Sequence, residues 1–189
     1  IAYFLASFPL LLARAVNGRI MIPLYRDHHP ATSAENFAKM RRLRFAITGG
    51  TLLLLGFLAV IGQPLVGLMY DARYGAAGLI VVAVALVQMP ETIGITYDQS
   101  ALAAGDGQTY FWLQAFKAVI QTIAFIVGIQ WAGLEGALLG QALALIAVHP
   151  AVIALARKHR AWDPLNDLVF FALAAVLVAL AWWVNIAGM

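Results

Sequence analysis

The stretch Phe45–Met69 contains no charged residue, and this constrains the fold more than any other feature of the sequence. At about 1.5 Å of rise per helical residue, roughly 20 apolar residues are needed to cross about 30 Å of hydrocarbon. Within a bilayer, backbone N–H and C=O groups must be hydrogen-bonded inside the protein, which favours a helix. The stretch is therefore predicted to be a transmembrane helix.

Five further segments have similar length and character. The composition agrees, because 63% of the residues are hydrophobic and 11% charged, whereas a soluble domain has about 45–50% and about 25%. We expect an all-α integral membrane protein of about six transmembrane helices, without a soluble domain of its own. The predicted spans are Ile1–Leu24, Phe45–Met69, Ala76–Ala104, Phe111–Trp131, Ala137–Ala156 and Leu168–Ala187.

Basic residues concentrate in two of the predicted connections, Tyr25–Arg44 and Arg157–Asp167. Basic loops face the cytoplasm, so these two connections are predicted to be cytoplasmic and Tyr70–Gly75 external. Ser33 precedes a short segment with apolar Phe37, which predicts a capped interfacial helix inside the first connection. The basic residues either fix topology alone or also bind acidic lipid or phosphate.

The chain begins with Ile1 inside an apolar run, and Arg14 and Arg19 come late in that run. A signal peptide has its positive charge before a shorter apolar run. We therefore expect the chain to be a piece of a longer protein whose N-terminal part is missing.

Polar residues inside the first span lie at helical spacing. Tyr3, Ser7, Arg14 and Asn17 share one face, with Arg14 near the middle of the span. Charges at this depth are costly and mark candidate functional sites. The stripe either faces a water-filled cavity or pairs with acidic residues to hold the bundle together; Arg19 lies nearer the interface.

Two more polar stripes lie in the third and fourth spans, which a tight Gly105-Asp106-Gly107 turn connects. Counting residues from this turn places Glu91 and Lys117 at similar depths, so an ion pair between them is expected, facing a shared polar cavity. Pro90 removes a helix hydrogen bond next to Glu91 and predicts a local break. The stripes are Gln88, Glu91 and Asp98, and Gln114, Lys117 and Gln121.

Motifs for covalent chemistry are absent from the sequence. His28-His29 has no further ligands at metal spacing, and there is no Walker motif, nucleophile elbow or HExxH. We expect neither an enzyme nor a cofactor, metal or nucleic-acid partner. His149 is either proton-linked or a packing residue, and Gly136 and Gly140 predict close helix packing.

Four segments together resemble the C-terminal half of the polysaccharide or oligosaccharide-lipid flippases, within the multidrug/oligosaccharidyl-lipid/polysaccharide exporter superfamily. A polar helix ends in Ile-Pro-Leu-Tyr before a basic loop, and a Gly-Gln-Pro-Leu segment leads into a short outer turn. An Ala-Ala-Gly inner turn and a Gly-Leu-Glu-Gly-Ala outer turn follow in the same order as in that family. The segments are Ile22–Tyr25, Gly62–Tyr70 with Tyr74, Ala101–Gly107 and Gly133–Ala137.

This resemblance implies one bundle of a two-bundle transporter in the bacterial inner membrane. Such flippases move undecaprenyl-diphosphate-linked oligosaccharide between leaflets by alternating access, for polysaccharide or lipopolysaccharide biosynthesis. The resemblance implies that Arg14 and Arg19 hold the diphosphate, with Ser7 and Asn17 on the same cavity-lining helix. Partners would be the lipid-linked oligosaccharide, membrane lipids and the N-terminal bundle.

Two other classes stay open. An ion-coupled multidrug exporter of the same superfamily is favoured by an acidic, aromatic cavity. A non-transporting assembly subunit is favoured if every charge is paired between helices.

Overall fold

The computed structural model describes residues 2–69 and 75–187, and these residues are helical apart from short turns. Five helices are long and apolar enough to cross a membrane, as expected for an all-helical, multi-pass membrane protein. The described ranges contain no β-strand. The helices are α1 (Ala2–Asp27), α2 (Ala34–Met69), α3 (Gly75–Ala103), α4 (Gly107–Lys158) and α5 (Pro164–Ala187).

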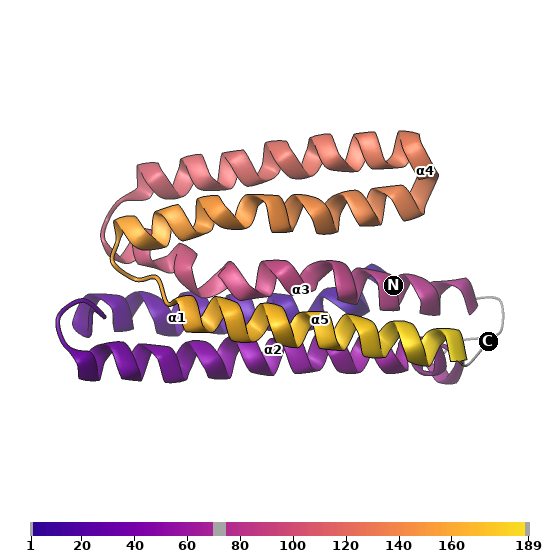
Figure 1. The fold of residues 1–189 in the computed structure, drawn as a ribbon, viewed down its shortest axis with the longest axis horizontal. Coiled ribbons are helices and arrows are strands. Elements are labelled where there is room, and N and C mark those ends of the chain that lie inside the picture. The colour runs from indigo at the N-terminus through magenta and orange to yellow at the C-terminus, as the bar shows by residue number, and fades with distance from the viewer. Residues whose placement is uncertain (1, 70–74, 188–189) are drawn as a thin grey trace.

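The fourth helix contains two of the predicted spans. Ala132 (φ −143°, ψ 30°) and Gly133 (φ 59°, ψ −137°) are non-helical, and the positive φ of Gly133 is a conformation that glycine adopts without strain. The chain reverses there, so α4 consists of two antiparallel arms (Figure 1). The described residues thus form five helices, with two of the predicted spans joined in α4 because the expected outer connection shrinks to these two residues.

Small residues hold the two arms of α4 together. A Cβ placed on Gly128 would overlap the backbone of Gly136, and one on Gly140 would overlap the carbonyl of Ala124. The prediction of close packing at Gly136 and Gly140 is confirmed. These close contacts lie within α4, between its first arm and its second arm.

The second helix begins at Ala34, well before the predicted start at Phe45. Ser33 Oγ accepts a hydrogen bond from the backbone N–H of Asn36 at 3.1 Å, which caps the helix as expected. The prediction of a separate interfacial helix was wrong, because no glycine or proline interrupts the sequence between Asn36 and Phe45. The connection to α1 is only residues 28–33.

The third helix lies at the centre of the bundle. It packs against α1, α2, α4 and α5. The predicted break at Pro90 is not observed: α3 continues as one helix from Gly75 to Ala103, with Pro90 inside it. The main apolar core joins α2, α3 and α5 through Leu52, Leu55, Met89, Ile93 and Phe170.

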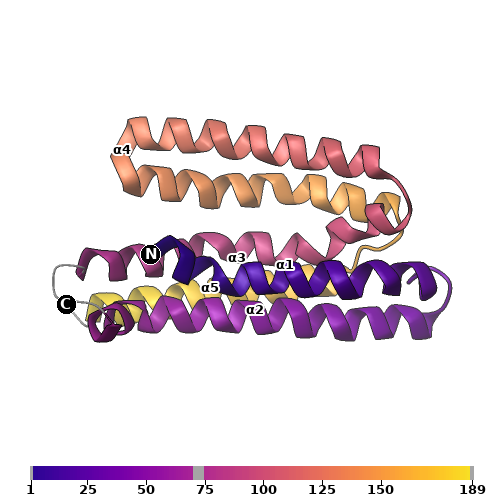
Figure 2. The ribbon, with the colours of Figure 1, turned by 180° about the vertical axis from the view of Figure 1, so that it is seen from behind.

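The connections after α1, α3 and α4 lie at one end of the bundle, and the reversal within α4 lies at the other (Figures 1 and 2). The two basic connections therefore share an end, as the topology prediction requires. The predicted Tyr70–Gly75 connection falls on residues 70–74, which lie outside the described ranges.

Candidate functional site

The most exposed charge near mid-bundle is Arg14 on α1, which forms an ion pair with Glu91 on α3. Both residues lie near the middle of their helices. The Arg14 side chain is 51% exposed and that of Glu91 21%. The expected Glu91–Lys117 ion pair was therefore wrong, because Glu91 is paired with α1 instead of α4.

Lys117 pairs instead with Asp98, which lies about two turns closer to the α3–α4 connection than Glu91 does. Its Nζ donates to Asp98 Oδ2 at 2.7 Å, and Gln114 Nε2 donates to the same oxygen at 3.1 Å. Asp98 is buried. Glu91 and Asp98 lie on one face of α3 at a spacing of seven, so the helical pattern alone could not decide which of them Lys117 contacts.

The other members of the α1 stripe point into the bundle. Ser7 Oγ accepts from Gln88 Nε2 at 3.1 Å, and Asn17 Nδ2 donates to the carbonyl of Ile95 at 2.7 Å. Both α1 residues are buried against α3. Ser7, Asn17 and Gln88 thus join the two helices, while Arg14 and Arg19 remain exposed.

Gln121 joins the two arms of α4. Its backbone carbonyl accepts a hydrogen bond from Gln141 Nε2 at 2.9 Å. This contact belongs to the packing of the two arms. It involves α4 alone, whereas the Arg14–Glu91 pair joins α1 to α3.

A fully buried arginine was missed as a candidate. Arg44 was counted among the basic loop residues, but it lies inside α2 with no exposed surface. Its Nη2 donates to Tyr25 Oη at 2.6 Å, and its guanidinium lies 4.8 Å from the ring centroid of Tyr97. The spacing of Arg44, Thr48 and Thr51 on one helical face was the signal that could have found it.

A carboxylate network closes the same end of the bundle. Arg41 donates two hydrogen bonds to Asp163, at 2.6 Å from Nε and 2.9 Å from Nη2. Asp167 accepts from Tyr97 Oη at 2.9 Å and from Trp162 Nε1 at 2.8 Å. Some basic residues of this end therefore bind the α4–α5 turn, beyond any effect on topology.

His149 on α4 lies beside this network. Its Nε2 lies 3.4 Å from Asp167 Oδ2, and its ring packs edge-on against Phe171 with the centroids 4.8 Å apart. These contacts join α4 to α5.

Within residues 2–69 and 75–187, no group of three His, Asp or Glu side chains is arranged to hold a metal ion. Comparisons with protein-family models, curated proteins and solved structures found no significant match to this chain. The function proposed below therefore rests on the residues themselves.

Proposed function

We propose that this chain forms one helical bundle of a flippase for undecaprenyl-diphosphate-linked oligosaccharide, with Arg14 contacting the diphosphate. The basic end faces the cytoplasm of a bacterial inner membrane, and the six spans include both arms of α4. A second bundle covers the face that bears Arg14. Alternating access between the two bundles carries the anionic headgroup across the membrane.

The exposure of Arg14 at the midpoint of α1 carries this proposal. A charged side chain facing lipid at the centre of a bilayer costs about 3 kcal/mol on insertion scales. Arg14 lies too far from either helix end to reach the interface easily by snorkelling. With half of its side chain uncovered, Arg14 is best accommodated on a face that lines water or meets another bundle.

Glu91 has a distinct role in this mechanism. In the absence of substrate it neutralises Arg14 and holds the guanidinium on the α1–α3 face. A diphosphate offers more negative charge and more acceptor oxygens than one carboxylate, and the planar guanidinium binds such oxygens in pairs. Substrate therefore displaces Glu91 from Arg14, and Glu91 takes Arg14 back after release.

Arg19 serves initial capture. It is exposed on the same helix and lies closer to the basic end than Arg14 does. A headgroup entering from the cytoplasmic leaflet would meet Arg19 before Arg14.

The test uses the full-length protein in a strain whose surface polysaccharide depends on it. Arg14→Ala should abolish export, and Arg14→Lys should retain part of it because the charge stays while the paired donors are lost. Glu91→Gln should bind a diphosphate headgroup more tightly, because the competing carboxylate is gone. Arg19→Ala should reduce export less than Arg14→Ala.

Arg26→Ala is the matched control, since it removes an exposed arginine of α1 at the helix end. Its export should stay normal. Normal export by a well-expressed, correctly inserted Arg14→Ala variant would contradict the proposal.

One observation favours the alternative of an assembly subunit without transport. Both mid-bundle carboxylates, Glu91 and Asp98, are paired with cations of neighbouring helices. Under that alternative, Arg14→Ala and Glu91→Gln would each lower stability. The double variant would restore it, and none of the three would change headgroup binding.

A further inference from the structure

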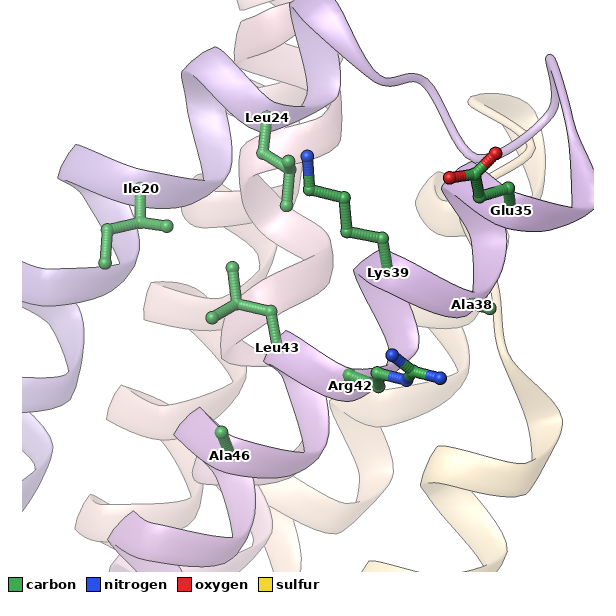
Figure 3. Close-up of a pocket in the computed structure, with 8 residues that line it drawn as sticks. All are labelled: Ile20, Leu24, Glu35, Ala38, Lys39, Arg42, Leu43 and Ala46. Atoms are coloured by element: carbon green, nitrogen blue, oxygen red, sulfur yellow. The ribbon is translucent and has the colours of Figure 1, made fainter.

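A groove of about 650 Å³ opens between the second half of α1 and the first half of α2 (Figure 3). It lies at the basic end of the bundle and shares no residue with the Arg14–Glu91 pair. Ile20 and Leu24 of α1 form one wall, and Leu43 and Ala46 of α2 form the other. These four side chains make both walls apolar.

Charged side chains stand at one end of this groove. Lys39 extends towards Leu24, and Arg42 follows on the next turn of α2 (Figure 3). Both are exposed. Glu35 lies on the same rim, so two cations and one carboxylate leave a net positive charge there.

This arrangement matches the two parts of a phospholipid. An apolar groove on the outer surface of a membrane helix pair is filled by acyl chains, because these are the solvent at that depth. Cations at the interfacial end of a membrane helix attract anionic headgroups, with a contribution of about 1 kcal/mol per Lys or Arg. Lys39 lies opposite Leu24, towards the α1–α2 connection, and the exposed Arg42 lies one turn further along α2 beside Leu43, so both cations are near a headgroup placed at that end.

We propose that the α1–α2 groove is a binding site for an anionic phospholipid, with an acyl chain along Ile20, Leu24, Leu43 and Ala46. The phosphate lies between Lys39 and Arg42. The site is independent of the proposed transport, since it uses a different side of α1. A lipid bound there joins α1 to α2 at the end where their connection is only residues 28–33.

Native mass spectrometry of the purified chain tests the site, with phosphatidylglycerol and phosphatidylcholine as probes in a neutral detergent. Phosphatidylglycerol should bind in preference. Lys39→Gln and Arg42→Gln should each weaken it roughly fivefold, and the double variant roughly 25-fold, as expected from independent charge contributions. Arg26→Gln removes the same charge from the same end outside the groove and should change binding less than twofold.

A second variant tests the apolar part. Ala46→Trp fills the groove while every charge remains, and it should weaken phosphatidylglycerol binding by a similar factor. Inorganic phosphate alone should not compete, because it lacks the acyl chain. Equal losses in Arg26→Gln and Arg42→Gln, or unchanged binding in Ala46→Trp, would overturn the site. A gel-filtration profile identical to that of the parent shows that each variant remains folded.

Discussion

Lys117 Nζ lies 2.7 Å from Asp98 Oδ2, and this ion pair joins α3 to the first arm of α4 with both side chains almost fully covered. It is the least exposed Lys or Arg ion pair of the mid-bundle. Gln114 adds a second donor to the same carboxylate oxygen. The pair thus connects the central helix α3 to the first arm of α4 near the middle of the bundle.

Removing one partner of this pair should be more damaging than removing both. A buried charge left without its counterion costs about 3–5 kcal/mol of stability. Asp98→Asn and Lys117→Gln should each lower the free energy of unfolding by about 3 kcal/mol, and the double variant should recover at least half of the summed loss. Unfolding in mixed micelles with increasing SDS measures these changes.

The Glu91→Gln and Lys117→Gln cycle is the matched control for that experiment. These residues are not partners in the structure, so their effects should add within about 0.5 kcal/mol. Coupling between Glu91 and Lys117 as large as that between Asp98 and Lys117 would contradict the pairing described here.

Arg44 should be replaceable by an apolar side chain of similar length. It is fully buried, and its Nε and Nη1 have no hydrogen-bond partner among the described residues. Replacing a buried charge by a well-packed apolar residue is often neutral or stabilising, whereas truncation leaves a cavity that costs about 2–5 kcal/mol.

Arg44→Met should therefore be at least as stable as the parent, and Arg44→Ala should be less stable by about 3 kcal/mol, within the range for truncation in a core. In the parent, Tyr25 Oη donates to the carbonyl of Thr96 at 3.2 Å, and neither substitution removes this donor or this acceptor. Equal destabilisation by Met and Ala would show that the charge itself is required, through its contact with the ring of Tyr97.

The reversal of α4 should be sensitive to a single methyl group. Gly128→Ala places a Cβ against the backbone of Gly136, which cannot move without separating the arms. Overpacking of this kind costs about 1–3 kcal/mol. Gly50→Ala is the control, because Gly50 is exposed in α2 with no atom within 4 Å of an added Cβ.

Gly50→Ala should be neutral or slightly stabilising, since alanine favours helix by up to about 1 kcal/mol over glycine. Both variants are compared by the SDS concentration at half-unfolding. A Gly128→Ala variant as stable as Gly50→Ala would show that the arms do not pack as closely as described.

Stability at acid pH should depend on Asp106 in the turn between α3 and α4. Hydrogen bonds from Lys158 and then Thr109 hold the pKa of this carboxyl well below its ordinary value of 3.8. A carboxyl with a lowered folded-state pKa stabilises the protein above its unfolded-state pKa, and this contribution is lost as the pH falls through the folded-state value.

Asp106→Asn keeps a side chain that caps α4 but removes the charge that Lys158 contacts. The parent should be more stable than Asp106→Asn at pH 6, and the difference should shrink steadily below pH 4. Unfolding midpoints measured at intervals between pH 6 and pH 3 give this comparison. A difference that grows on acidification would contradict the assigned sign.

Much of the helical layout could be predicted from the sequence, because apolar length and charge spacing are local properties. Phe45–Met69 needed no information beyond its own composition, and Ser33 was recognisable as the cap of a helix. The reversal at Ala132 and Gly133 was placed correctly but drawn too long, since the number of residues a turn needs depends on how closely Gly128 and Gly136 allow the arms to approach.

The sequence by itself determined which residues are charged at membrane depth and which helical face each one occupies. Only the tertiary structure decided their partners. Glu91 and Asp98 share a face of α3, so periodicity left both within reach of Lys117, and the packing of α1 against α3 assigned Glu91 to Arg14. The spacing of Arg44 with Thr48 and Thr51 pointed to a shared helical face, but the burial of Arg44 arises from Tyr25 and Tyr97, which belong to other helices.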